Sequence, residues 1–264
     1  QPPLPPPLPP PSPPPPSPPL PIPPPYAPFW FWQRDDVLDR PWYSSREYLL
    51  EWFERDATTL KPEDGLHKLS GWGYLNTTQY QEIVRAAAAR LDPPLRDGDS
   101  IFELGCGVGG VLSVLAQQYP RLKPAGCDFS AGAIRRALEL FPHGEFVVGD
   151  MSEKDGTCVS STTSGTFDHV ISFGALAMYL TKREMASALR NAFSLVAPGG
   201  SVAFTHFLDL EGQNRGTIVE PVARAHLKHL ATAAGFTDVR FHGLPHQGDR
   251  FMITARRSPA PSAV

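Results

Sequence analysis

The sequence predicts an α/β fold, with a mostly parallel sheet that carries helices on both of its faces. From about residue 100 onward, short apolar runs alternate with amphipathic stretches, which is the pattern of alternating strands and helices. Two apolar runs follow one another near the end of the chain, which predicts a hairpin and therefore one antiparallel strand. A glycine-rich run directly after the first apolar run is typical of a ligand-binding loop between a strand and a helix.

The first 28 residues are of low complexity and hold 19 of the chain's 31 prolines. Proline fixes φ and lacks an N–H group, so neither a helix nor a sheet is expected there. We expect a stiff polyproline II spacer, with a ligand for a partner's aromatic groove as the alternative. The run at 12–16 resembles the Ser-Pro repeats of plant and algal wall glycoproteins. Cytoplasm and endomembrane lumen are therefore both kept as locations.

Residues 29–98 are predicted to form an aromatic-rich N-terminal helical cap or lid, residues 99–257 the α/β core and residues 258–264 a C-terminal tail. In the cap, one helix is expected after a capping box of Ser44 and Glu47. A second helix, Tyr80–Leu91, is expected to be capped by Thr78 and Gln81.

In the core, the strands are expected at Ser100–Leu104, Lys123–Cys127, Glu145–Val148, Phe167–Phe173, Ser201–Phe207, Asp238–His242 and Arg250–Ala255. The helices are expected at Val111–Tyr119, after a Ser130 cap, after a Thr181 and Glu184 capping box, and at Pro221–Ala234.

Charge, hydropathy and cysteine count exclude several classes of function. The net charge is −3, so no global basic field recruits nucleic acid. No apolar run reaches the ~18–20 residues of a membrane span. Three cysteines exclude a disulfide framework and a four-cysteine zinc site. Cys106 and Cys127 are expected in the core, whereas Cys158 is expected to be exposed in the loop 156–165.

The central motif is the run from Glu103 to Gly110, Glu-Leu-Gly-Cys-Gly-Val-Gly-Gly, between the first strand and its helix. Glycines let the backbone approach a ligand closely, and the helix N-terminus adds free N–H groups. Gly105, Gly107 and Gly110 also fit the G-x-G-x-x-G pattern. A nicotinamide-dependent oxidoreductase and a purely structural turn therefore remain alternatives.

An acidic residue lies at or just beyond the end of each of the first three strands. Glu103 would oppose a pyrophosphate but suits an ammonium group. Asp128 can accept two hydrogen bonds from the hydroxyls of a ribose. Asp150 can accept from an exocyclic amine, and Met151 can pack on a flat ring. Together they describe a ligand with an adenine, a ribose and a positively charged amino-acid tail.

An ordered set of five motifs resembles the class I S-adenosylmethionine-dependent methyltransferases: Glu103–Gly110, Asp128, Gly149-Asp150, Phe167–Ile171 and Leu195–Gly200. The resemblance covers about residues 78–257. It implies a Rossmann-like, doubly wound seven-stranded sheet with the last strand antiparallel, and S-adenosyl-L-methionine as the cofactor. The cofactor-binding residues that it implies are Glu103, Gly105, Cys106, Gly107, Asp128, Phe129, Asp150, Met151, Ser172 and Phe173.

The expected reaction is transfer of a methyl group to a nucleophilic O, N or S of a small-molecule acceptor by in-line displacement. The protein has to align the acceptor and exclude water, so no catalytic triad is expected. The loop Phe173–Leu180 lacks the Asn/Asp-Pro-Pro-Tyr type motif of amino-methylating enzymes, which argues against nucleic acid. A non-catalytic adaptor, which binds the cofactor and recruits partners through the Pro-rich tail, is the remaining alternative.

The candidate substrate residues are Trp72, Tyr74, Gly174, Met178 and His206. Tyr74 and His206 are weak candidates for catalysis, and His206 suits a general base near neutral pH. A structural role is the alternative for both. His206, Asp209 and Glu211 fit no ligand template, so no metal site is expected.

Overall fold

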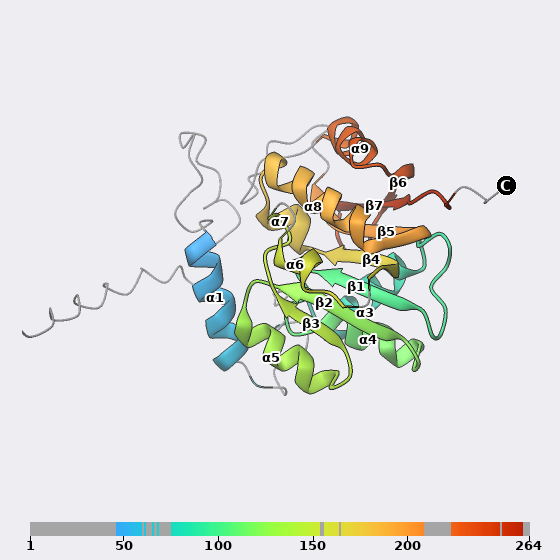
Figure 1. Cartoon of the computed structure of the whole chain (residues 1–264). Coiled ribbons are helices and arrows are strands. Elements are labelled where there is room, and N and C mark those ends of the chain that lie inside the picture. The colour runs from blue at the N-terminus through green and yellow to red at the C-terminus, as the bar shows by residue number, and fades with distance from the viewer. Residues whose placement is uncertain are drawn as a thin grey trace, which may run out of the picture.

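The computed structural model describes residues 46–59, 61, 65, 68, 75–153, 156–163, 165–208, 223–248 and 250–260. These residues form one seven-stranded sheet between two layers of helices (Figure 1). The predicted Pro-rich tail and most of the aromatic segment that follows it lie outside these ranges. The boundaries of the tail and the cap therefore stay predictions.

The strands are β1 (Ser100–Leu104), β2 (Lys123–Asp128), β3 (Glu145–Val148), β4 (Phe167–Phe173), β5 (Val196–Leu208), β6 (Thr237–Gly243) and β7 (Arg250–Arg256). Their order in the sheet is β3-β2-β1-β4-β5-β7-β6. The pairs from β3 to β5 are parallel, whereas β7 runs antiparallel to both β5 and β6. The expected doubly wound sheet with an antiparallel last strand is confirmed.

One face of the sheet carries α3 (Thr77–Ala88), α4 (Gly110–Gln118) and α5 (Ala131–Leu140). The other face carries α6 (Thr157–Ser160), α7 (Ala175–Tyr179), α8 (Lys182–Leu195) and α9 (Arg224–Ala233). Because both faces are covered, the central strands β1 and β4 are buried on both sides, as central strands of a parallel sheet require. A further helix, α1 (Arg46–Thr59), lies beside α5 (Figure 1). Among the helices in the described ranges, none has the length and apolarity that a bilayer crossing needs.

Local capping signals explain where several helices begin. Ser130 caps α5, and Thr181 with Glu184 forms the capping box of α8, as predicted. The predicted cap of α3 is wrong: Asn76 and Gln79 form the capping box, and α3 begins at Thr77. Asn is as good a cap as Thr, so the neighbouring polar residues offered two competing starts.

The prediction for Cys158 is also wrong. It lies in α6, which the sequence pattern does not predict, and its side chain is fully buried. Cys158 forms a disulfide with Cys127 of β2, 31 residues earlier in the chain. Cys106 is a buried free thiol, as expected for a core residue.

Candidate cofactor site

The three predicted acidic residues lie at one edge of the sheet, because β3, β2 and β1 are neighbours and run parallel. Glu103 is the fourth residue of β1, Asp128 is the last residue of β2, and Asp150 follows β3 by two residues. In an open α/β sheet, ligands bind at the carboxyl ends of the strands. The structure therefore brings Glu103, Asp128 and Asp150 to the edge where a ligand is expected.

The glycine loop between β1 and α4 is anchored to β2. The N–H groups of Gly105 and Cys106 both donate to the carbonyl of Cys127, at 2.8 and 2.9 Å. Gly105 has φ of 71°, and a Cβ there would lie 2.7 Å from the Met151 side chain. Gly107 also has a positive φ, 51°, but a Cβ there would meet no atom within 4 Å among the described residues. Gly105 is thus required by packing, whereas Gly107 leaves room for a ligand.

Glu103 is the least satisfied acidic group of this edge. Its side chain is 1% exposed, and its Oε2 has no hydrogen-bond partner among the described residues. Burial, and then the nearby charge of Asp128, raise its pKa well above the usual value, although the Phe173 N–H partly opposes this. A buried carboxyl without a partner is costly, so Glu103 calls for a cation or a donor beyond the residues that the structure describes.

The Asp128 carboxylate accepts hydrogen bonds from two segments, the glycine loop and the start of α5. Its Oδ1 accepts from the Ser130 N–H and its Oδ2 from the Gly107 N–H, both at 2.9 Å. Burial raises the pKa of Asp128 to about 6, against the opposing effect of these N–H groups. The carboxylate therefore fixes the relative positions of the glycine loop and the start of α5.

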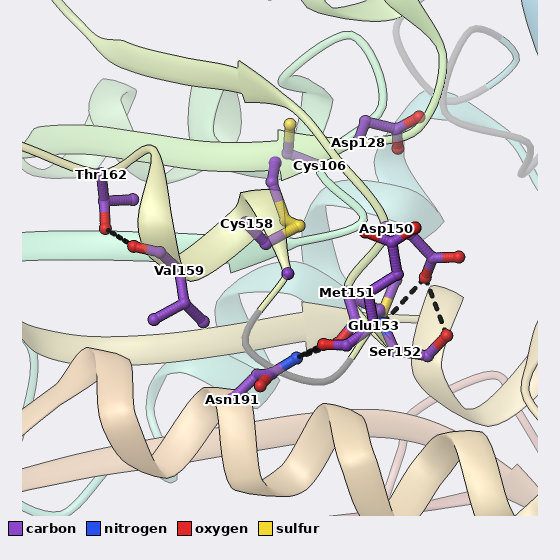
Figure 2. Close-up of a disulfide and its surroundings, with 12 residues drawn as sticks. Cys106, Asp128, Asp150, Met151, Ser152, Glu153, Cys158, Val159, Thr162 and Asn191 are labelled. Atoms are coloured by element: carbon purple, nitrogen blue, oxygen red, sulfur yellow. Dashed lines mark hydrogen bonds between the residues drawn. A yellow bond between two sulfur atoms is a disulfide. The ribbon is translucent and has the colours of Figure 1, made fainter.

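The loop after β3 is held in place by hydrogen bonds within the loop and from α8 (Figure 2). Asp150 Oδ1 accepts from both the N–H and the hydroxyl of Ser152 at 2.8 Å. Asn191 of α8 donates to the carbonyls of Met151 and Glu153, at 2.9 and 2.7 Å. These bonds fix the course of the loop and place the Met151 side chain against Gly105.

The disulfide between Cys127 and Cys158 completes this arrangement. It joins the residue before Asp128 to α6, which follows the Asp150 loop in the chain (Figure 2). Sequence analysis missed both the disulfide and Asn191. The disulfide spans 31 residues, and Asn191 bonds to residues about 40 positions earlier, so no local pattern reveals either.

The predicted cofactor residues Ser172 and Phe173 end β4, and the predicted substrate residue Gly174 comes directly after it. Ser172 is fully buried, and its hydroxyl accepts from the Leu176 N–H at 3.2 Å, so it supports the start of α7. Gly174 precedes α7 with φ of 92°. The Phe173 backbone contacts Glu103, as described above. The end of β4 therefore lies next to Glu103.

His206 lies at the same end of β5, within the irregularity between Phe204 and Phe207. It is buried, with φ of 73°, and its Nδ1 lies 2.6 Å from Thr205 Oγ1. Burial, and then the charge of Arg250, lower its pKa well below the usual value. The imidazole is therefore neutral at pH 7. Positive φ is uncommon for a residue other than glycine, and such strain clusters at functional sites.

Several predicted residues lie outside the described structure. They are Trp72, Tyr74, Asp209, Glu211 and the side chain of Met178. Within the described ranges, no three His, Cys, Asp or Glu residues are grouped as metal ligands.

The residues that are described fit a cofactor with an ammonium group and a nucleoside. Glu103 Oε2 is buried without a partner and matches an ammonium group. Gly107 leaves space where a Cβ would otherwise stand. Two buried acidic groups on adjacent strands oppose a diphosphate, which weighs against a dinucleotide.

Comparison with known proteins agrees with this chemistry. Residues 101–200 match the model of a methyltransferase domain family. The chain is 29% identical over 143 residues to the tRNA N(3)-methylcytidine methyltransferase Mettl2 of Drosophila melanogaster, covering 49% of this chain and 40% of the relative. It is 25% identical over 163 residues to a trans-aconitate 2-methyltransferase of Paracidovorax citrulli, covering 62% and 60% of the two chains.

The fold is also found among solved structures. An O-methyltransferase family protein from Burkholderia thailandensis superimposes with a TM-score of 0.58 at 15% identity, over 83% of this chain and 64% of that one. The chain spans between 40% and 60% of the length of the two sequence relatives named above. From the ordered motifs, the matched domain and the shared fold, we conclude that this chain carries a methyltransferase domain of the class I S-adenosylmethionine-dependent family.

Proposed function

We propose that the chain transfers a methyl group from S-adenosylmethionine to a nucleophilic atom of a small-molecule acceptor. The observation that carries this proposal is the buried Glu103, whose Oε2 has no partner among the described residues. In the proposed site, Glu103 binds the ammonium of the methionine moiety, and Gly107 leaves the space beside it. A bound cofactor would give Glu103 Oε2 the partner that it lacks within the described part of the chain.

The nucleoside is assigned to the neighbouring strand ends. Asp128 would accept from the ribose hydroxyls, and Asp150 from the adenine amine. Met151 would pack on the adenine ring from its place against Gly105. The loop that carries Asp150 and Met151 is already ordered by Asn191 and by the disulfide, so little order has to be created on binding.

The cofactor supplies a methyl group that its sulfonium already activates. The chain's own residues then have to position the acceptor, exclude water and hold one proton. His206 is neutral at pH 7 and lies at the same end of the sheet as Gly174. We assign it the role of general base toward an acidic acceptor proton. Loss of activity without loss of cofactor affinity in His206→Gln would support this role, and unchanged activity would remove it.

A small-molecule acceptor is favoured by the similarity to the trans-aconitate enzyme and by the low net charge. Because the Drosophila relative acts on tRNA, tRNA is the second candidate acceptor. A labelled methyl donor distinguishes the two. Label in a panel of small carboxylic acids, phenols and amines supports the proposal, whereas label in tRNA alone overturns the small-molecule assignment.

The cofactor assignment is tested first, by calorimetric titration with S-adenosylmethionine and with S-adenosylhomocysteine. Binding of both supports the site, and absence of heat and of thermal shift with either overturns it. A parallel fluorescence titration with NADH tests the oxidoreductase alternative. Donor binding without any methylated product across both acceptor classes would favour the adaptor.

A further inference from the structure

The helix α1 contacts the elements that surround the proposed nucleoside site. Phe53 of α1 makes an edge-on ring contact with Phe129, with ring centroids 5.9 Å apart. Ala57 packs with Val108 of the glycine loop and Ala133 of α5. Among the described side chains, these apolar contacts place α1 against Phe129, the glycine loop and α5.

The carboxylate of Glu54 joins α1 to the start of α5 by hydrogen bonds. Its Oε2 accepts from the Ser130 hydroxyl at 2.7 Å and from the Gly132 N–H at 2.8 Å. Its Oε1 lies 3.2 Å from Arg135. Hydrogen bonds between a charged acceptor and N–H or O–H donors are among the stronger ones in proteins.

Glu54 and Ser130 together cap α5. The Ser130 hydroxyl accepts from the Ala133 N–H at 3.0 Å and donates to Glu54. Glycine at 132 is required for this, because a Cβ there would lie 2.6 Å from Glu54 Oε1. The negative charge of Glu54 also lies at the N-terminus of α5, where it interacts favourably with the positive end of the helix dipole. Burial raises the pKa of Glu54, but the Gly132 N–H, the Ser130 hydroxyl and the Arg135 guanidinium outweigh it and lower the pKa below its usual value.

The cap connects directly to the proposed ribose site. The Ser130 N–H donates to Asp128 Oδ1, and Asp128 Oδ2 accepts from the Gly107 N–H. Phe129 stands between Asp128 and Ser130 and bears the ring contact with α1. A continuous series of contacts thus runs from Glu54 through Ser130 and Asp128 to the glycine loop.

We propose that Glu54 is a positioning residue for the cofactor, which pins α1 to the N-terminus of α5 and so fixes Asp128 and Phe129 around the nucleoside. This inference rests on the proposed function, since it takes Asp128 as the ribose-binding residue. Glu54 does not itself touch the cofactor in this proposal. It acts by holding α1 and the cap of α5 in the arrangement that the site needs.

The test uses three variants of the full chain: Glu54→Gln, Asp128→Asn and Glu51→Gln. Glu51 is a matched control, because it is an exposed glutamate on the same helix, one turn earlier. Titration calorimetry with S-adenosylhomocysteine gives the affinity of each. We expect Glu54→Gln to weaken binding about tenfold, the size of a lost charged cap, and Glu51→Gln to stay within about twofold.

A second readout separates positioning from a merely structural cap. In the unsubstituted chain, S-adenosylhomocysteine should slow amide hydrogen exchange in 47–59, and Glu54→Gln should abolish this slowing. In turnover assays, the KM for the donor should rise while kcat stays near its original value.

The outcomes are distinguishable. If Glu54→Gln lowers the melting temperature but leaves affinity and exchange unchanged while Asp128→Asn weakens binding, the positioning role is wrong and the cofactor site stands. If Asp128→Asn also leaves the affinity unchanged, the site assignment itself is wrong.

Discussion

Acidic side chains differ between the two edges of the central sheet, one at the amino ends of its parallel strands and the other at their carboxyl ends. At the amino-end edge, Asp168 accepts from the N–H and the hydroxyl of Ser100, at 2.8 and 2.7 Å. Burial raises its pKa, but these hydrogen bonds outweigh it and lower the pKa. At the carboxyl-end edge, burial raises the pKa of both Glu103 and Asp128.

This contrast distinguishes the polar groups that stabilise the fold from the carboxyl that we assign to ligand binding. At the amino-end edge the chain satisfies its own polar groups, including the buried His169 between Ser201 and Asp99. At the carboxyl-end edge it keeps an unsatisfied carboxyl in the interior, which lowers stability unless a ligand compensates. The edge with this unsatisfied carboxyl is the one to which we assign the cofactor.

Loss of the disulfide should have the largest effect on stability at the carboxyl-end edge. Removing a cross-link over 31 residues, as in Cys158→Ser, should lower the free energy of unfolding by about 3 kcal/mol. Urea denaturation of the variant and the parent, without reductant, measures this. Thiol alkylation of the unfolded chain in urea, before and after reduction, provides the control: the unreduced parent should show one thiol, and three would contradict the disulfide.

Glu103→Gln should have the largest effect on binding. It replaces the charge that we assign to the ammonium, so the Kd for S-adenosylhomocysteine should rise about 100-fold. The melting temperature of the ligand-free chain should not fall, because a costly buried carboxyl is removed. A loss of stability with unchanged affinity would show that Glu103 stabilises the fold, as Asp168 does, and would contradict the difference between the two edges.

Asp168→Ala is the matched change at the other edge. It leaves Ser100 without its acceptor, so unfolding should become easier by about 2 kcal/mol. The affinity for S-adenosylhomocysteine should stay within about twofold. Denaturation and calorimetry on the same sample check both halves of this expectation, and a tenfold loss of affinity would contradict it.

The smallest expected effect concerns pH. Asp128 holds its proton up to about pH 6 when folded but releases it near its usual value of 3.8 when unfolded. Its contribution to stability is therefore complete below about pH 4 and is lost as pH rises through 6, by at most ~1.4 kcal/mol per pH unit. The pH dependence that Asp168 contributes has the opposite sign. Because folding lowers its pKa, its contribution to stability is present above its unfolded pKa and is lost as the pH falls through its folded pKa.

Melting temperatures at pH 5 and pH 7.5, compared between the parent and Asp128→Asn, isolate the contribution of Asp128. The parent should lose more stability than the variant on going to the higher pH. Equal losses in the two proteins would show that Asp128 is not buried as a raised-pKa group.

The sequence was sufficient for features that depend on local patterns. Strand ends, the glycine loop and the Ser130 and Thr181 caps are encoded by neighbouring residues, and the parallel order of β1, β2 and β3 then brings Glu103 and Asp128 together. Thr78 was wrong as a cap because Asn76, two residues earlier, has the same chemistry. Glu54 and Asn191 could not be assigned, because their partners lie 76 and about 40 residues away and only the folded chain joins them.

The sheet also separates the free cysteine from the two cysteines of the disulfide. The disulfide belongs to the apolar layer beneath α8, whereas Cys106 belongs to the layer beneath α4. Burial, and then the nearby carboxyls, keep the Cys106 pKa well above its usual value, so little thiolate forms. Disulfide exchange requires a thiolate that can reach the bond. We therefore expect little exchange between Cys106 and the disulfide, although Cys106 lies in the glycine loop that is hydrogen-bonded to Cys127.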